Sequence, residues 1–405
     1  MHLLVRLAVR NLVRNRRQTA LMGAIVAFGT WAMVASWGLT DGSTASMVNA
    51  QTSLDTSDLQ LHRPGYLDDP DLANVFSRAQ LAQLKATLRG YKVVDAVALR
   101  LVSEGLLQSA YGSQGVSVRG VEPDLEARVT QLGQRVVAGR LVSQPGEVVL
   151  GQTLAKKLDV RLGERVVLNV QGVKRTRSEG LRLVGVVHAG LALLDQATAF
   201  VHLDDVRELT GVEGASDVVI ALNPGANAQR FRQTLQRALG DGVEVSSVFE
   251  LHPLISAMVR IGRFEMLPMM LLLAALAGFG VANTVTFSVL KRLREFGVVL
   301  ALGLRPKQLA RLITLETVFV SLAGFLVGAL LGYGLNVYLE RVGINMGFYS
   351  GTFPDLGIPQ VIHAKATWVH SLYALIVVIV TAVVASRYPA RRVSNLEPTE
   401  AMRYV

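Results

Sequence analysis

The stretch TVFVSLAGFLVGALLGYGLNVYL, residues 317–339, contains no Asp, Glu, Lys or Arg. An α-helix needs about 20 apolar residues to cross the hydrocarbon core of a bilayer. Lipid offers no hydrogen-bond partners, so such a segment must satisfy its backbone internally and is expected to be helical. Gly324, Gly328 and Gly332 place a stripe of small residues on one face. We expect the stripe to serve close helix packing; a functional hinge is the alternative.

Three further stretches without charged residues lie at 18–40, 266–290 and 366–386. Each is long enough to cross a bilayer as a helix, in a chain that is 51% hydrophobic and 18% charged. The pattern predicts an α-helical membrane protein with four transmembrane helices in a 1+3 layout, with a large domain between the first and the second. The first stretch exceeds the roughly 7–15 apolar residues of a cleaved signal peptide, so we expect a retained anchor.

The net charge of +10 is concentrated beside the predicted span ends. Residues 1–18, 291–311 and 387–405 together carry +12, whereas residues 41–262 carry −1. Basic flanks mark the cytoplasmic side of a membrane protein. We therefore expect both termini and 291–311 to be cytoplasmic and the large domain to be extracytoplasmic. This distribution favours membrane lipids over nucleic acid as the partner of the basic residues.

The first 18 residues place Arg6, Arg10 and Arg14 on one helical face, with leucines on the rest. This predicts a helix lying at the inner membrane surface; a basic flank that only fixes topology is the alternative. The predicted organisation is an interfacial helix at 1–18, spans at 19–40, 263–290, 312–340 and 367–387, an extracytoplasmic domain at 41–262, a cytoplasmic segment at 291–311, an outer loop at 341–366 and a cytoplasmic tail at 388–405.

The large domain alternates short strand and helix patterns, which predicts an α+β fold. Two lobes joined near Pro145–Gly146 are one interpretation. The expected strands are 59–62, 115–120, 147–150, 165–170, 181–187, 199–202, 217–222 and 243–247, and the expected helices are 77–90, 152–158, 204–210 and 226–239.

Catalytic patterns are not found in the sequence. There is no G-x-x-x-x-G-K-[ST] nucleotide-binding loop, no H-E-x-x-H zinc motif and no cysteine. Asp68, Asp69 and Asp71 are read as a solvated turn rather than a cation site. Glu316, at the inner end of the third span, is expected to pair with Arg311 or Lys307 rather than to carry protons. We therefore expect neither an enzyme nor a bound cofactor or metal in this chain.

The segment REFGVVLALG, residues 294–303, lies between the second and third spans and ends on glycine. We expect a short helix, a glycine break and a new helical start at Arg305–Pro306, with Gly297 and Gly303 both able to form a tight bend or a close backbone approach. The apolar residues Phe296, Val299, Leu300 and Leu302 lie beside charge. Such a patch is typical of a docking element, and a loop packed on its own bundle is an equal alternative.

The residues LKRLREFGVVLALGLRPKQLARLITLE, 290–316, resemble the cytoplasmic coupling segment of the type VII ABC-transporter permeases. This family includes the macrolide-exporter (MacB-type), cell-division (FtsX-type) and lipoprotein-releasing (Lol-type) permeases. RLAVRNLVRNRRQTALMGAIVAFG, 6–29, and YPARRVSNLEPTEAMRY, 388–404, resemble its first helices and its tail, with Met402 where leucine is usual. GEVVLGQTLAKKLDVRLGERVVLNV, 146–170, LRLVGVVHAGLALLDQATAFVHLDDVREL, 181–209, and VFELHPLISAMVRIGRFEMLPMMLLL, 248–273, resemble the Lol-type permeases, although Phe249 stands where a tryptophan is frequent.

The resemblance implies a multi-pass permease of the bacterial inner membrane that couples ATP hydrolysis by a separate ATPase to movement of its periplasmic domain. The implied partners are a cytoplasmic ABC ATPase dimer, which would hold the ATP and Mg²⁺, a second permease copy or a sister subunit, and a periplasmic lipoprotein carrier or adaptor. The residues implied to couple to the ATPase are Arg294, Glu295, Phe296, Gly297, Leu300, Ala301, Leu302 and Gly303.

Three functions follow from the resemblance: extraction of lipoproteins or other lipid-anchored cargo, mechanotransmission for efflux of the macrolide-exporter type, and regulation of a periplasmic hydrolase. The lipoprotein function is favoured by the likeness of the outer domain. Methionine side chains adapt to varied apolar ligands, and tryptophan is frequent at membrane interfaces. The candidate substrate residues, in the outer halves of the first two spans, are Trp31, Trp37, Met266, Met269 and Met270.

Overall fold

The computed structural model describes residues 2–347 and 361–394 and divides the chain into two compact units. The helical unit holds residues 2–44, 260–344 and 363–394. The sheet domain holds residues 45–259 and the described parts of 345–362. Much of the predicted outer loop and tail, residues 348–360 and 395–405, lies outside the described residues.

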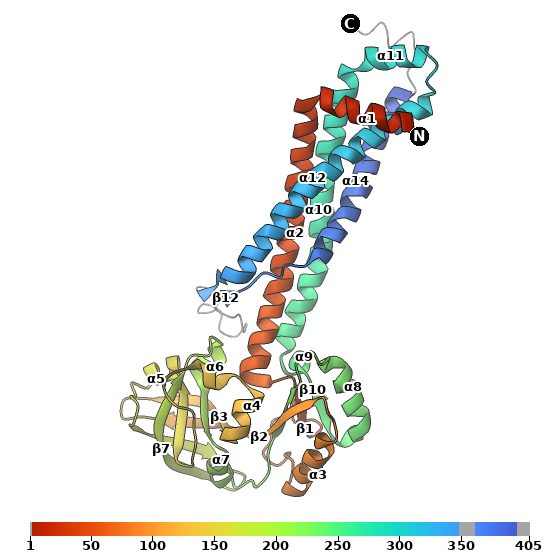
Figure 1. The fold of residues 1–405 in the computed structure, drawn as a ribbon. Helices are drawn as coiled ribbons and strands as arrows, with labels where there is room; N and C mark the ends of the chain where they lie inside the picture. Colours follow the sequence, from red (N-terminus) through yellow and green to blue (C-terminus); the bar gives the residue numbers. More distant parts are fainter. Residues whose placement is uncertain (1, 348–360, 395–405) are drawn as a thin grey trace. The chain divides into compact units, whose positions relative to one another are not determined.

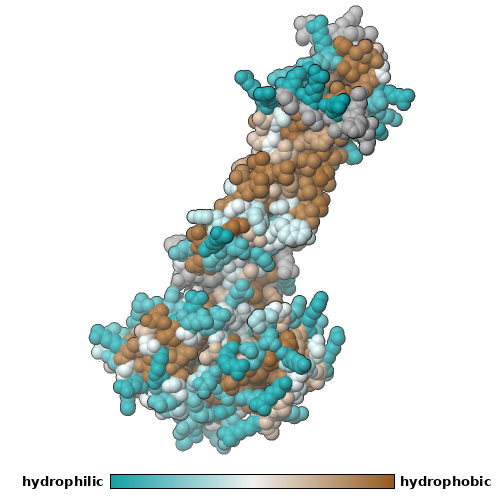
Figure 2. Space-filling view, in the orientation of Figure 1, coloured by the Kyte–Doolittle hydropathy of each residue, from teal (hydrophilic) through white to brown (hydrophobic). Residues whose placement is uncertain are grey.

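The helical unit is built on four long helices (Figure 1), α2 (Arg16–Gln51), α10 (Pro253–Lys291), α12 (Pro306–Val342) and α14 (Trp368–Ser394). Among the described residues, these four are long and apolar enough to cross a membrane. The first three contain one uncharged stretch each, and α14 contains all but the first two residues of the fourth. Figure 2 shows apolar side chains covering the visible face of the long helices, with polar side chains gathered at the end where α1 (His2–Arg14) lies.

The helices are longer than the predicted spans. α2 continues through Asp41, Gly42 and Ser43, where the sequence predicted the start of the outer domain, and ends at Gln51 before the π-helical turn η1 (Thr52–Thr56). α10 begins well before the predicted second span, at Pro253. Composition marks the part of a helix that suits lipid, whereas the helix itself ends only where its backbone hydrogen bonds end.

The glycine stripe of α12 lies against the backbone of α2. A Cβ atom placed on Gly324 would lie 2.6 Å from the carbonyl oxygen of Gly23. One placed on Gly328 would lie 2.2 Å from that of Ala27, and Gly332 is similarly close to α2. No side chain fits in these spaces, so the contact between α2 and α12 depends on the stripe.

The sheet domain contains a ten-stranded sheet with the order β10-β1-β9-β2-β3-β8-β5-β7-β4, in which β6 also pairs with β2 and β7. Its pairs are antiparallel except β3 with β8 and β5 with β7. The strands are β1 (Leu59–His62), β2 (Val94–Gln108), β3 (Ser113–Val121), β4 (Val136–Gly139), β5 (Glu147–Gly151), β6 (Arg165–Gln171), β7 (Thr176–Val187), β8 (Thr198–His202), β9 (Asp217–Leu222) and β10 (Glu244–Ser246). Two further short strands, β11 (Ile344–Asn345) and β12 (Val361–Ile362), pair with each other.

The long strand β2 belongs to two lobes. Its first half, Val94–Arg100, pairs with β9 in the four-strand lobe β10-β1-β9-β2. Its second half pairs with β3 and β6, and the ring β2-β3-β8-β5-β7-β6 closes into the barrel lobe. Two lobes are therefore present, but the predicted junction at Pro145–Gly146 is wrong. That pair lies between β4 and β5, both in strand contact with β7 of the barrel.

The predicted strands and helices of the domain are found in the structure, and two strands and two α-helices were missed, besides two short 3₁₀ helices. The missed strands and α-helices are β2, β4, α4 (Pro123–Val129) and α6 (Ala192–Ala197). β2 escaped notice because Asp95, Arg100 and Glu104 interrupt its apolar residues. The remaining helical elements are α3 (Arg78–Arg89), η2 (Leu132–Arg135), α5 (Gln152–Lys157), α7 (Leu203–Thr210), α8 (Ala228–Leu239), η3 (Gly240–Gly242) and α9 (Val248–Leu251).

Candidate functional site

The segment predicted to couple to an ATPase forms the short helix α11 (Leu293–Ala301), as the sequence predicts. Gly303 follows with φ +98°, a conformation that favours glycine over residues with a side chain. Arg305 caps α12, and Pro306 occupies its first turn, where the missing N–H costs nothing. The helix, the glycine break and the new helical start are confirmed; binding of an ATPase stays a prediction.

α11 has one packed and one open face. Phe296 and Gly297 are buried, and Phe296 belongs to a core cluster with residues of the long helices. Val298 and Val299 are exposed, and Leu302 is 82% exposed. The expectation that the segment packs on its own bundle is therefore confirmed, whereas docking stays a prediction for the exposed apolar residues. Among the predicted residues, Gly297 lies on the packed face and Leu302 on the open one.

A set of charges fixes α11 to its neighbours. Glu316 of α12 accepts hydrogen bonds from Arg292 Nη1 at 3.0 Å and from Asn11 Nδ2 at 2.6 Å. Glu295 is ion-paired with Arg14 of α1 and lies 3.4 Å from Arg292 Nε. The prediction that Glu316 pairs with Arg311 or Lys307 is therefore wrong. Arg292 lies at the end of α10, and the turn into α11 places its guanidinium beside Glu316.

A pocket of about 50 Å³ lies beside this pair, within the helical unit. Its wall combines Arg292 and Glu316 with uncharged polar side chains of α2 and α10 and with apolar ones of α12. Several of the hydroxyls are already bonded to their own helices, as Thr284 is to the Gly280 carbonyl at 2.8 Å. We assign the pocket no ligand.

The five candidate substrate residues do not form one site. Trp37 and Met270 pack against one apolar cluster. Trp31 instead packs on Phe28, with ring centroids 5.5 Å apart. Met269 is exposed, and Met266 is half-buried. Only Trp37 and Met270 are therefore brought together.

Trp37 has a polar neighbour that the sequence did not predict. Its ring stacks on His370 of α14, with centroids 5.6 Å apart. His370 is buried, and its Nε2 lies 2.9 Å from a carboxylate oxygen of Asp41 on α2. Tyr373 stacks on the same indole at 5.2 Å. Nothing in the sequence relates residues so far apart along the chain.

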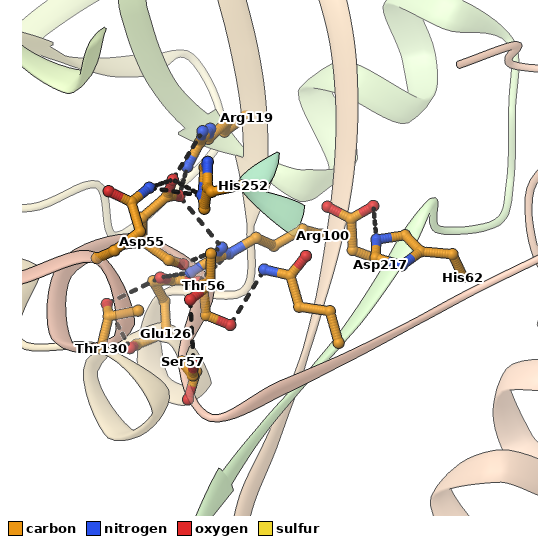
Figure 3. A network of polar contacts seen from close by, with 12 residues as sticks. Asp55, Thr56, Ser57, His62, Arg100, Arg119, Glu126, Thr130, Asp217 and His252 are labelled. Atoms are coloured by element: carbon orange, nitrogen blue, oxygen red, sulfur yellow. Dashed lines mark hydrogen bonds and ion pairs between the residues drawn. The ribbon is translucent and has the colours of Figure 1, made fainter. Parts of the chain in front are cut away.

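The sheet domain holds a buried polar cluster, also not predicted (Figure 3). Asp55 of η1 is ion-paired with Arg119 of β3, and its backbone carbonyl accepts a 2.6 Å hydrogen bond from Arg100 Nη1. Arg100 of β2 is 2% exposed and donates to both carboxylate oxygens of Glu126 on α4, at 2.5 and 3.0 Å. Burial alone would lower the pKa of Arg100, but Glu126 and Asp55 together raise it above its ordinary value, so the guanidinium stays charged.

His252 and Gln51 complete the cluster. Gln51 Nε2 lies 2.9 Å from Asp55 Oδ2 and 2.7 Å from His252 Nε2. Burial lowers the pKa of His252, an effect that Asp55 opposes and Arg119 reinforces, so His252 favours its neutral form. We call this set the Asp55 cluster; it comprises Gln51, Asp55, Arg100, Arg119, Glu126 and His252. A polar cavity of about 130 Å³ adjoins it.

One signal in the sequence could have indicated the Asp55 cluster. Arg100 and Arg119 each interrupt an apolar strand, in VALRLV and VSVRGV. An arginine at such a position is rarely buried without a partner. Its partners lie far away in sequence and cannot be identified without the fold. Among the described residues, no group of His, Cys, Asp or Glu is arranged to hold a metal ion.

Two family models match the chain. The MacB-like periplasmic core domain matches residues 19–238, and the FtsX-like permease C-terminal model matches residues 268–398. A solved structure of the periplasmic region of MacB from Actinobacillus actinomycetemcomitans is similar over 50% of this chain and 94% of its own, with 15% identity and a TM-score of 0.37.

Curated relatives match over both units. The lipoprotein-releasing system transmembrane protein LolC of Neisseria meningitidis is 26% identical over 361 residues, covering 84% of each chain. LolE of Haemophilus influenzae is 24% identical and covers 71% of this chain and 72% of its own. The macrolide export ATP-binding/permease protein MacB of Hyphomonas neptunium is 23% identical and covers 98% of this chain and 60% of its own. The chain therefore belongs to the ABC-transporter permeases that combine a MacB-like periplasmic core domain with an FtsX-like permease domain.

Proposed function

We propose that this chain is the permease subunit of an ABC transporter that extracts lipoproteins or other lipid-anchored cargo from the inner membrane. The observation that carries the cargo assignment is the match to lipoprotein-releasing relatives over most of both chains. The four long apolar helices would span the membrane, one before and three after the sheet domain. The basic flanks favour a cytoplasmic location for both termini and a periplasmic one for the sheet domain.

The energy for extraction of the cargo would come from a separate ATPase dimer that holds ATP and Mg²⁺, and it would act by moving the sheet domain. Its docking surface on the permease would be residues 294–303. The open face of α11 supports this assignment, because an apolar surface next to charge at the predicted cytoplasmic end suits a protein partner. The Arg292–Glu316 pair and Phe296 would hold the helix in place while it is pushed.

The cargo surface is proposed around Trp37 and Met270, which pack against one cluster of the helical unit. Trp31, Met266 and Met269 stay candidates outside that pair. The proposed partners also include a second permease copy or a sister subunit, membrane lipids and a periplasmic lipoprotein carrier or adaptor.

A second candidate function is mechanotransmission for efflux. It is supported by the macrolide-export relative, whose match covers 98% of this chain. In that case the sheet domain would drive a periplasmic adaptor, and cargo would not pass along the helices. Regulation of a periplasmic hydrolase is the remaining alternative from the family.

The test is affinity purification of the full chain from native membranes in mild detergent, followed by mass spectrometry and an ATPase assay. We expect a stoichiometric ATPase together with acylated lipoproteins. An ATPase with a periplasmic adaptor and no lipoprotein would favour efflux, and one with a hydrolase would favour regulation. Recovery of no ATPase would contradict the assignment of residues 294–303.

A further inference from the structure

The main body of the sheet domain, residues 45–259, has two connections to the rest of the chain. α2 and η1 lead into it, and α9 and α10 lead out of it. The two units divide within α2 and within α10, at 44/45 and 259/260, so each helix is continuous across the division. A displacement of either helix therefore reaches the sheet domain at the ends Gln51 and Pro253.

The Asp55 cluster links these two connections to each other. Gln51 is the last residue of α2, and His252 directly precedes α10. Their side-chain nitrogens are 2.7 Å apart, and Asp55 contacts both, at 2.9 Å from Gln51 and 3.9 Å from His252. Residues from the two ends of the domain's sequence are thus held together within it.

The same cluster links both connections to the sheet. Arg119 extends from β3 and Arg100 from β2, the strand shared by the two lobes. Glu126 of α4 binds Arg100 through both carboxylate oxygens. Two parallel hydrogen bonds between a guanidinium and a carboxylate fix orientation as well as distance, and burial strengthens them. Glu126 thereby holds Arg100 in place, and the contacts of Arg100 and Arg119 with Asp55 tie η1 to the sheet.

We propose that the Asp55 cluster is the joint that transmits a displacement of α2 or α10 to the sheet domain and so changes the orientation of the domain, with Asp55 as its positioning residue. This inference rests on the proposed function, in which ATP-driven movement of the helices reaches the sheet domain. Without the Asp55 carboxylate, Arg119 loses its ion-pair partner and Gln51 loses a contact near His252. The helices then move without changing the orientation of the domain.

The chain has no cysteine, so spin labels can be placed without removing native thiols. We would introduce Tyr111→Cys in the sheet domain and Glu340→Cys in the helical unit, both exposed. The labelled chain would be diluted with unlabelled chain and bound to its co-purified ATPase. Pulsed electron paramagnetic resonance would then give the distance between the two spin labels without nucleotide and with Mg²⁺–ATP. We expect a nucleotide-dependent shift in the distance. Asp55→Asn should abolish most of this shift while ATP is still hydrolysed.

Glu147→Ala is the matched control. Glu147 is also a buried carboxylate paired with an arginine, Arg140, but it lies at the start of β5 in the barrel lobe, outside both connections. We expect Glu147→Ala to destabilise the domain and to keep the nucleotide-dependent shift. Arg119→Lys, which preserves the charge facing Asp55, should keep more of the shift than Arg119→Ala. If Asp55→Asn does not fold, the comparison of Arg119→Lys with Arg119→Ala tests the proposed joint.

The outcomes separate the joint from the proposed function. A full shift in wild type, in Asp55→Asn and in Arg119→Ala would overturn the joint and leave the function standing. Equal loss of the shift in Glu147→Ala would also overturn it, because general destabilisation would then suffice. No shift in wild type, despite ATP hydrolysis, would count against ATP-driven movement of the domain and remove the basis of the joint.

Discussion

At the scale of the residue, His252 makes the sheet domain sensitive to acid. Burial lowers the pKa of His252 below its ordinary value of 6.5. Between the two values the unfolded chain binds more protons than the folded chain, so stability falls as the pH decreases through 6.5. We therefore expect acidification from about pH 7.5 to about 5.5 to lower the free energy of unfolding through this group. Urea unfolding of the full chain in detergent, followed by hydrogen exchange of β1–β10, measures the loss. His252→Gln should flatten the pH dependence of the free energy of unfolding. If this variant has the same pH profile as wild type, groups other than His252 cause the loss of stability.

Arg292 forms two ion pairs that differ in burial. The Arg292–Glu316 side chains are 9% and 14% exposed, whereas Glu295 is 50% exposed. Removing one partner of a buried pair leaves a charge without compensation and costs about 3 kcal/mol or more, whereas an exposed pair contributes about 1 kcal/mol or less. We therefore expect Glu316→Ala to lower the thermal unfolding temperature of the full chain far more than Glu295→Ala. Similar decreases in the unfolding temperature of the two variants would mean that both ion pairs are exposed to solvent.

At the scale of the element, the contact of α12 with α2 depends on its glycines. A Cβ atom on Gly328 would lie 2.2 Å from a backbone oxygen of α2, whereas one on Gly334 meets no atom within 4 Å. Gly328→Leu should therefore force the helices apart and lower the free energy of unfolding by about 1–3 kcal/mol or more. Gly334→Leu, in the same helix, is the control and should change it little. Thermal unfolding of both variants in detergent compares them, and equal losses would contradict close packing at Gly328.

The sequence predicted individual helices and strands better than it predicted which of them pack against each other. Uncharged stretches long enough to span a bilayer identified the four long helices, because the thickness of a membrane imposes a length on them. A glycine break and the start at Pro306 could be predicted because glycine tolerates a positive φ and proline fixes its own φ, and both are local properties. The Arg292–Glu316 pair and the Asp55 cluster could not, because their members meet only after the helices and strands have packed. The closed barrel was missed for the same reason, since β2 pairs with strands on both sides.

At the scale of the whole molecule, the open face of α11 is the surface proposed above for docking of an ATPase. Leu302 is 82% exposed, so a charge there would leave the fold intact and oppose an apolar contact. We expect Leu302→Glu to reduce ATPase co-purification at least tenfold without changing thermal stability. Lys307 is exposed and lies outside 294–303, so Lys307→Glu is the control for added negative charge. Full retention of the ATPase by Leu302→Glu would place the docking surface elsewhere. Gly297 is unsuited to this test, because it is buried and a large side chain there would disturb packing.

The sharing of β2 also has a consequence for the order in which the domain folds during synthesis. Both partners of β1, namely β9 and β10, come near the end of the domain's sequence, whereas all six barrel strands fall between Val94 and His202. Contacts that close long loops form late, and a chain folds from its first-made end as it emerges. The barrel can therefore close while β1 is still unpaired. The four-strand lobe, and with it the link between Gln51 and His252, is completed only when the last residues before α10 have been synthesised.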